Sequence, residues 1–197
     1  MTNPRSPSSI RKFPYRTNPI PRPANRSNLT HIHHRTTPLH LARQLLDFTP
    51  GETQSALLTT PAPYVLLNCH RQWGKTTLTA VRALHQALPR QNILIVSPTP
   101  RQSRLLTSLC QSFARKLLLS FTTDGANPCS VRLPNGSLIL ALPAHPAHAR
   151  GFNAHLLIVD EAARFSDEVF SAITPLIAAT SGSSPRPTAN AASSIAN

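Results

Sequence analysis

The chain has 197 residues and a net charge of +13, from 20 lysines and arginines against seven aspartates and glutamates. That length accommodates one domain with an ordinary hydrophobic core. The charge favours a polyanionic partner such as duplex DNA, although charge alone does not distinguish DNA from RNA. Its cysteines, Cys69, Cys110 and Cys129, include no C-x-x-C pair, which fits a reducing cytoplasm and argues against a zinc site. No apolar stretch approaches the length of a membrane span.

Both ends of the chain have the composition of disordered segments. Residues 1–38 contain seven prolines, seven basic residues and no acid, and so cannot bury enough apolar surface to offset the entropy of ordering. This basic arm either holds DNA phosphates or is a solvated tail or translated upstream sequence. Residues 180–197 are mainly Ser, Ala, Pro, Thr, Gly and Asn. We therefore expect one folded domain over residues 39–179.

The first site signal is a strand, a loop and a helix in that order. Tyr64–Asn68 is an apolar run that follows the Pro-rich turn 61–63, which predicts a buried strand. The residues after the loop show helical spacing of apolar side chains, at Leu78, Val81, Leu84 and Leu88.

The loop between these elements has the spacing of a phosphate-binding loop. In the pattern G-x-x-x-x-G-K-[ST], backbone N–H groups surround the nucleotide phosphates, the lysine reaches the outer phosphates and the hydroxyl binds Mg²⁺. Cys69 takes the first glycine position, and Gly74, Lys75 and Thr76 fill the others. A Gly-Lys-Thr triplet occurs by chance in many proteins, so the surrounding strand and helix are what favour a nucleotide site.

The middle of the chain predicts the rest of an α/β domain with a mainly parallel central sheet flanked by helices. Asn92–Ser97 is β-branched and apolar, and the sequence Pro134-Asn135-Gly136 is typical of a hairpin turn. A helix is predicted from Leu105, Leu106, Leu109, Phe113 and Leu117, and the hairpin strands from residues 131–133 and 137–142.

Two adjacent acids supply the second half of the predicted site. Residues 155–159 read as a buried parallel strand that delivers Asp160 and Glu161 at its carboxyl end, where open α/β sheets bind ligands. Asp160 would hold Mg²⁺ together with Thr76, and Glu161 would activate the attacking water. The alternative is an acidic pair that begins a helix. A closing helix follows, which Pro175 ends or kinks.

These motifs resemble those of the large subunits of phage terminases, the motors that package DNA into procapsids. The loop Cys69–Thr77 is similar to the variant phosphate loop of that family, in which Cys or Ser and then Arg-Gln precede Gly-Lys-Ser/Thr. Further matching pieces follow in the family's order, namely residues 93–99, 101–103, 135–137, Arg150-Gly151 and 159–163. The resemblance covers residues 39–179.

The resemblance implies a P-loop NTPase fold, ATP and Mg²⁺ as cofactors, and roles for further residues. Arg71 would contact the phosphates within its own subunit, Arg150 would act across a subunit boundary, and Gln54 would lie near the adenine. For each arginine the alternative is a solvated or DNA-facing charge. The implied nucleotide-binding residues are Gln54, Cys69, Arg71, Gln72, Gly74, Lys75, Thr76 and Thr77.

The function implied by the resemblance is ATP hydrolysis coupled to translocation of double-stranded DNA into a procapsid. The resemblance also implies that the chain forms a homo-oligomeric ring at a portal, possibly with a small terminase subunit, and that it works in the host-cell cytoplasm. Relatives carry a C-terminal nuclease domain with an acidic metal cluster, but no acid follows Glu168, so we expect a C-terminally truncated or frame-shifted chain without nuclease activity. The alternatives are an inactive remnant that binds nucleotide or DNA without turnover, and a helicase-like ATPase.

Overall fold

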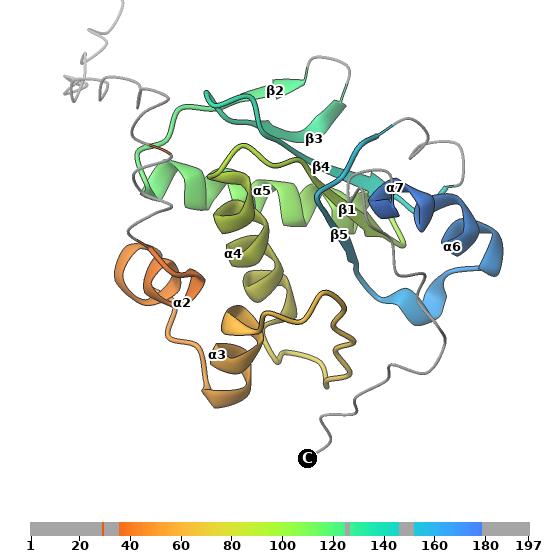
Figure 1. The fold of residues 1–197 in the computed structure, drawn as a ribbon, viewed down its shortest axis with the longest axis horizontal. Coiled ribbons are helices and arrows are strands. Elements are labelled where there is room, and N and C mark those ends of the chain that lie inside the picture. The colour runs from red at the N-terminus through yellow and green to blue at the C-terminus, as the bar shows by residue number, and fades with distance from the viewer. Residues whose placement is uncertain (1–28, 30–35, 125–126, 146–151, 179–197) are drawn as a thin grey trace, which may run out of the picture.

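The computed structural model describes residue 29 and residues 36–124, 127–145 and 152–178 (Figure 1). Within these residues, a five-stranded sheet with the order β2-β3-β4-β1-β5 has helices on both faces. The expected disordered arm and tail lie almost wholly outside the described residues, so they stay predictions.

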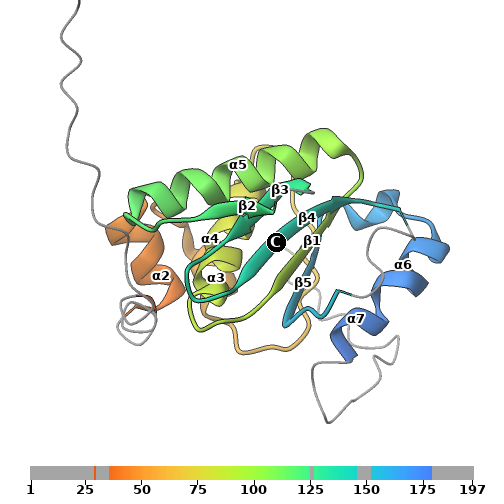
Figure 2. The ribbon, with the colours of Figure 1, turned by 90° about the horizontal axis from the view of Figure 1, so that it is seen from above.

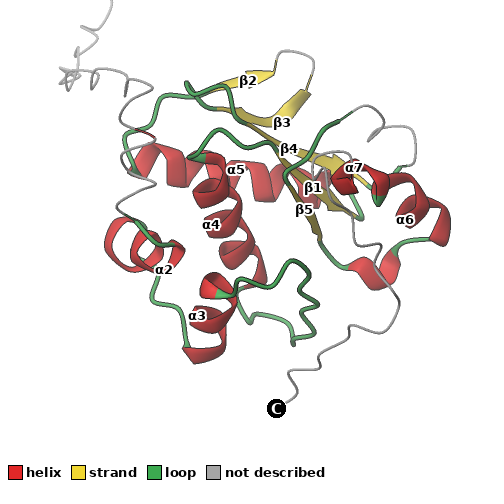
Figure 3. Ribbon diagram, in the orientation of Figure 1, coloured by secondary structure: helices red, strands yellow, loops and turns green. Residues whose placement is uncertain are grey.

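Along the chain, helical segments come first, strand β1 and helix α5 follow, and strands β2 to β5 then precede the last helices (Figure 3). The strands are β1 Ile93–Ser97, β2 Thr122–Asp124, β3 Asn127–Arg132, β4 Leu138–Pro143 and β5 Leu156–Val159. The helical segments are α2 Pro38–His40, a π-helical turn Leu41–Leu45, α3 Glu52–Thr59, α4 Lys75–Ala87, α5 Pro100–Lys116, a 3-10 turn Ala162–Arg164, α6 Asp167–Ile173 and α7 Pro175–Ala178.

The half of the sheet nearest the predicted site is parallel. Strand β1 pairs in parallel with β4 on one side and with β5 on the other, and Val96 lies opposite both Leu142 and Val159. Strands β3 and β4 form the antiparallel hairpin expected from Asn135-Gly136, and Gly136 adopts a φ of 92° in its turn. The short edge strand β2, which the sequence did not predict, pairs antiparallel with β3.

The two faces of β1 belong to different halves of the core. Ile93 and Ile95 point into a cluster with α4 and α5, whereas Leu94 and Val96 point into a second cluster with α6. Successive side chains of a strand point to opposite faces, so a strand covered by helices on both sides must be apolar throughout. Figure 2 shows α5 and α6 on opposite sides of the sheet.

The helices follow their predicted apolar spacing closely. In α4, the side chains of Leu78, Val81 and Leu84 are buried as expected. Helix α5 begins at Pro100 after Thr99, whose hydroxyl accepts a hydrogen bond from the Gln102 N–H at 3.3 Å, an N-cap arrangement. One member of the predicted α5 stripe does not fit, because Leu105 is 60% exposed.

The predicted strand Tyr64–Asn68 is wrong. These residues have no strand pairing, and the side chains of Tyr64, Val65 and Leu66 are 49%, 52% and 74% exposed. The apolar pattern describes a segment suited to a sheet, but a strand forms only where a neighbour supplies hydrogen bonds. Among the described residues, β5 pairs only with β1, and residues 64–68 join no strand of the sheet.

The prediction that Pro175 interrupts the closing helix is confirmed. Helix α6 ends at Ile173, and Pro175 occupies the first position of the separate helix α7. Proline lacks the N–H needed inside a helix but is compatible with its first turn. No helix in the part of the chain that the structure describes is long and apolar enough to cross a membrane.

Asn135 fastens the hairpin to the C-terminal end of α4. Its buried side chain donates hydrogen bonds to the carbonyls of Ala87 and Leu88, at 3.0 and 2.8 Å, and accepts one from the Ser137 N–H at 3.0 Å. The two carbonyls are among the last of α4, which have no partner within the helix.

We expect Asn135→Ala to lower the free energy of unfolding by about 2–3 kcal/mol, because it removes the Asn135 side chain as the hydrogen-bond partner of the Leu88 carbonyl and the Ser137 N–H. Urea denaturation followed by circular dichroism measures the loss. Asn68→Ala, at an exposed position, is the control and should change the unfolding free energy by less than about 0.5 kcal/mol. Equal effects of the two substitutions would contradict the assigned role of Asn135.

Candidate active site

The predicted phosphate-binding loop runs into the N-terminus of α4. Gly74 is the N-cap residue with a φ of 91°, and the first hydrogen bond of the helix runs from the Leu78 N–H to the Gly74 carbonyl at 3.0 Å. The N–H groups of Lys75, Thr76 and Thr77 therefore precede the helical hydrogen-bond ladder. Such N–H groups, with the positive end of the helix dipole, bind anions such as phosphate.

Two side chains hold the rest of the loop. The Lys75 ammonium donates to the Cys69 carbonyl at 3.5 Å, and Trp73 packs against the hydrophobic cluster that includes residues of α4 and α5. Gln72 adopts a φ of 64°, a left-handed conformation that is uncommon for a residue other than glycine. The side chains of Arg71 and Gln72 are exposed.

Gln54 contacts the loop itself, a contact that the sequence did not reveal. Its amide nitrogen donates to the Trp73 carbonyl at 2.6 Å, while its amide oxygen accepts from the Gly51 N–H at 2.8 Å. One side chain on α3 thus fixes the backbone next to Gly74. The expected position of Gln54 near an adenine stays a prediction. Its contact with the loop depends on how α3 packs, which residue spacing cannot show.

The acidic pair stands where the sequence placed it, at the carboxyl end of β5. The Asp160 N–H donates to the Val96 carbonyl at 2.9 Å, which extends the pairing of β5 with β1 by one residue. The strand itself is only half-buried, not fully buried as predicted. Burial of the Asp160 carboxyl raises its pKa, the neighbouring Glu161 charge raises it further, and Lys75 acts in the opposite direction.

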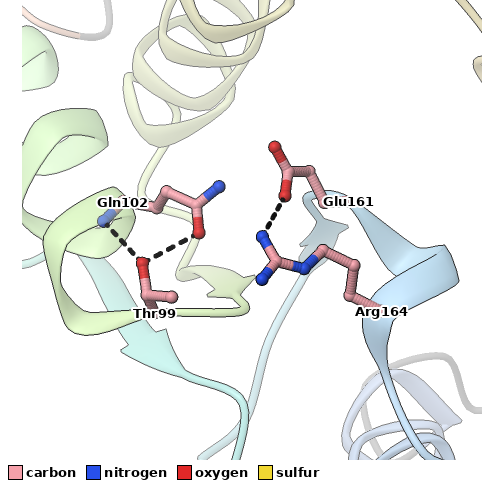
Figure 4. A network of polar contacts seen from close by, with 4 residues as sticks. All are labelled: Thr99, Gln102, Glu161 and Arg164. Carbon is pink, nitrogen blue, oxygen red and sulfur yellow. Dashed lines mark hydrogen bonds and ion pairs between the residues drawn. The ribbon is translucent and has the colours of Figure 1, made fainter.

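Glu161 turns away from the strand because its backbone is left-handed, with a φ of 51°. Figure 4 shows its carboxylate beside Arg164, whose guanidinium donates to it at 3.1 Å. Gln102 reaches it from the start of α5, and the Thr99 hydroxyl donates to the Gln102 amide oxygen at 2.9 Å. Hydrogen bonds from Gln102 and Arg164 lower the pKa of Glu161.

Arg164 and Gln102 were not predicted to be site residues. Arg164 follows Glu161 by three residues, a spacing that only the 3-10 turn after β5 converts into an ion pair. Gln102 is distant in sequence from Glu161 and meets it because β1 and β5 are neighbours. The sequence held no signal for either contact.

The chemistry of this donor set fits a magnesium ion. Mg²⁺ is bound in proteins through one or two carboxylates, hydroxyls and phosphate oxygens. Among the described residues, Asp160 forms no ion pair, and its half-buried carboxylate lies within electrostatic range of Lys75. Thr76 lies directly after Lys75 at the start of α4. Arg150 lies outside the described residues, so its role stays a prediction.

Comparison with known proteins agrees with this arrangement. The family model described as terminase large subunit, T4likevirus-type, N-terminal, matches residues 67–185, which is more than half of the chain. The chain belongs to the terminase large subunit family. The matched segment contains the phosphate-binding loop and the acidic pair of this terminase domain. No curated protein sequence matches the chain.

Solved structures show the same fold. The terminase domain is similar to the large terminase ATPase domain of Thermus phage P74-26, with 22% identity and a TM-score of 0.58, over 69% of this chain and 63% of that chain. It is equally similar to an arginine-to-alanine mutant of that domain, with 21% identity and a TM-score of 0.58, over 70% and 64% of the two chains. The matched part of this chain thus spans less than two thirds of the length of either.

Gly74 allows a test of the loop conformation. A Cβ atom at this position would lie 2.9 Å from the Gln54 amide nitrogen, in addition to the strain at a φ of 91°. We expect Gly74→Ala to destabilise the loop by about 1–2 kcal/mol and to weaken nucleotide binding correspondingly, by about tenfold. Isothermal titration calorimetry with an ATP analogue measures the change.

The matched control is Gly51→Ala. Its φ is −66°, and the nearest atom to an added Cβ is 3.8 Å away, so the substitution fits without strain. Its affinity should stay within about twofold of wild type. Unchanged affinity of Gly74→Ala would show that the loop does not need this backbone conformation.

Asp160 allows a test of the buried carboxylate. Because its pKa is raised in the folded state, the folded state binds the proton more tightly, and stability is lost as pH rises through that pKa. Asp160→Asn removes the charge, so we expect a melting temperature at pH 7 equal to or above that of wild type. The difference should narrow as pH falls. Thermal unfolding from about pH 4, near the ordinary carboxyl pKa, up to about pH 7 checks it, and a lower melting temperature at pH 7 would contradict the predicted cost of burying this charge.

Proposed function

We propose that this chain is the ATP-hydrolysing domain of a DNA-packaging motor. The observation that carries the proposal is the juxtaposition of the phosphate-binding loop at the start of α4 with Asp160 and Glu161 at the end of β5. Lys75 is within electrostatic range of both carboxylates. Strand β1 lies between β4 and β5, and α4 packs on one face of this parallel sheet, which fixes the relation of the two halves.

Phosphoryl transfer is catalysed by positioning of the reactants and by electrostatic stabilisation of the transition state. We assign these tasks to the residues of the site as follows. The N–H groups at the start of α4 and the Lys75 ammonium would bind the phosphates. Asp160 and Thr76 would hold Mg²⁺, which supplies charge neutralisation at the transferring phosphoryl group. Glu161 would orient the attacking water and accept its proton. Arg71, Cys69, Gln72 and Thr77 would surround the phosphates, and Gln54 would keep the loop in shape.

A low pKa keeps Glu161 ionised, so it is ready as a proton acceptor over the physiological range. The Arg164 guanidinium contacts the same carboxylate and competes with a water molecule for its oxygens. Arg150 would add charge at the γ-phosphate from a neighbouring subunit in a ring.

The proposed substrate of the motor is double-stranded DNA, moved towards a procapsid in the host-cell cytoplasm. The net charge of +13 supports a polyanionic partner whose backbone is gripped without reading its sequence. A portal-bound ring of identical subunits and a small terminase subunit are the proposed partners.

One observation favours a second function, nucleotide binding with little turnover. The segment that leads into the phosphate loop does not join the sheet, and Val65 and Leu66 are 52% and 74% exposed. A loop connected on one side to a segment outside the sheet is less rigidly positioned against Asp160 than one that follows a strand, and hydrolysis depends on position more than binding does.

Steady-state ATP hydrolysis with and without linear duplex DNA tests the proposal. We expect DNA to stimulate turnover by wild type, Glu161→Gln to lower kcat by roughly 10²–10⁴-fold, and Lys75→Ala to weaken nucleotide binding. Glu168→Gln, an exposed acid at the start of α6, is the matched control and should hydrolyse ATP as wild type does.

The outcomes separate the candidates. Nucleotide binding by a folded wild-type chain without turnover, with or without DNA, would favour the binding function. Undiminished hydrolysis by Glu161→Gln would overturn the role of that carboxylate. A strand-separation assay in the same reactions distinguishes a helicase-like ATPase, which would unwind a forked duplex, from a packaging domain, which would not.

A further inference from the structure

Ser97, the last residue of β1, carries a buried hydroxyl without a partner. Its exposed fraction is 0%, and its Oγ forms no hydrogen bond with any residue that the structure describes. Nearly all buried polar groups in folded proteins are hydrogen-bonded, because an unpaired one costs the free energy of removing it from water. The strand residues before it, 93–96, are all apolar, so the strand itself does not require a hydroxyl here. A polar group that is kept despite this cost indicates a functional constraint.

The sheet register places Ser97 beside Asp160. Strands β1 and β5 are parallel with Val96 opposite Val159. The Asp160 N–H donates to the Val96 carbonyl at 2.9 Å, which continues the pairing past the end of β5. Ser97 directly follows Val96, and Asp160 directly follows Val159. The two residues are therefore neighbours across the sheet, on strands that lie about 4.8 Å apart.

Both side chains leave the sheet on the face that α4 and α5 cover. Ile93 and Ile95 belong to the core cluster of that face, and Ser97 follows them in the two-residue alternation of a strand. On β5, Ile158 packs against the same cluster, and Asp160 lies two residues further on. The Ser97 hydroxyl and the Asp160 carboxylate therefore share one face of the sheet, at the carboxyl ends of their strands.

The Asp160 carboxylate can accept a further hydrogen bond. It accepts one from the Glu161 backbone N–H, but no side chain in the described part of the molecule donates to it. The adjacent Glu161 differs, because Arg164 and Gln102 reach its carboxylate (Figure 4). A carboxylate has about four acceptor positions, so a backbone N–H and a metal ion leave capacity for the Ser97 hydroxyl.

We propose that Ser97 is a positioning residue of the magnesium site, whose hydroxyl donates to the Asp160 carboxylate and so fixes the orientation in which that carboxylate binds Mg²⁺. This role rests on the proposed function, which assigns Asp160 to Mg²⁺. Carboxylates that ligate metals are themselves hydrogen-bonded, and these outer partners orient them. Between adjacent strands, rotation about the side-chain bonds is enough to bring a hydroxyl and a carboxylate of one face into contact.

The stability of the full chain without nucleotide tests whether the hydroxyl is unpaired. Ser97→Ala then removes a buried group that has no partner, so we expect the melting temperature to rise by about 2–4 °C. Ser137→Ala is the matched control. Ser137 is 1% exposed and its hydroxyl donates to the Ala87 carbonyl at 2.5 Å, so its removal should lower the melting temperature. A lower melting temperature of Ser97→Ala would show that its hydroxyl is already paired and would overturn the proposal.

The metal dependence of nucleotide affinity separates positioning from a purely steric role, in which any small side chain would serve. Isothermal titration calorimetry with the non-hydrolysable analogue AMP-PNP is run in Mg²⁺ and again in EDTA, and the ratio of the two affinities isolates the contribution of the metal. We expect Ser97→Ala to lower this ratio by about tenfold, since it removes a hydrogen bond to a charged group, while its affinity in EDTA stays within about twofold of wild type. Ser137→Ala should keep the wild-type ratio.

The same measurement in Asp160→Ala shows whether Ser97 acts through that carboxylate. This background has no carboxylate to orient, so adding Ser97→Ala should change the ratio by less than about twofold. A wild-type ratio in Ser97→Ala, or an equal loss with and without Asp160, would leave Ser97 a steric role only and refute the proposal. Failure of the proposed function gives a different pattern, because the wild-type chain itself would bind the analogue equally in Mg²⁺ and in EDTA. That result would refute both.

Discussion

The parallel pairing of β1 with β5 is the contact on which the rest of the site depends. It places Asp160 beside the end of β1, because the Asp160 N–H donates to the Val96 carbonyl. It also places Glu161 opposite the start of α5, where Gln102 reaches its carboxylate. Without that pairing, the acids and the residues that modulate them would be separated by some sixty residues of chain with no fixed relation. Carboxyl ends of parallel strands share an edge, so each adjacent pair of strands brings two loops together.

The two acids show how neighbouring carboxyls acquire different properties. Asp160 continues the strand into a half-buried position, where loss of solvent raises its pKa. Glu161 leaves the strand through a left-handed turn, and the donors there lower its pKa. The environments of the two carboxyls therefore separate their pKa values in opposite directions, as the proposed roles of metal ligand and proton acceptor require of identical functional groups.

Much of this could be predicted from the sequence. Fully covered elements carried strong signals. Strand β1 is apolar from Ile93 to Val96 because helices cover both faces, and the apolar stripe of α4 begins where the predicted phosphate loop ends. The prediction failed at Tyr64–Asn68, because apolar residues indicate a preference for burial while a strand also needs a neighbour. Contacts of Gln54 and Gln102 could not be predicted either, since each joins two elements whose packing the local pattern does not encode.

Asn135 has a mechanical consequence for the domain. Helix α4 has the predicted phosphate-binding residues at one end and, at the other, the two carbonyls that Asn135 holds. Its 13 residues make a rod about 20 Å long, which transmits an axial push with little deformation. A displacement of Lys75 would therefore be transmitted to the β3–β4 turn at the other end of the helix. The β3–β4 turn would then move when a ligand displaces the predicted phosphate-binding loop. A molecule that contacts this turn would respond to the ligand without contacting the loop.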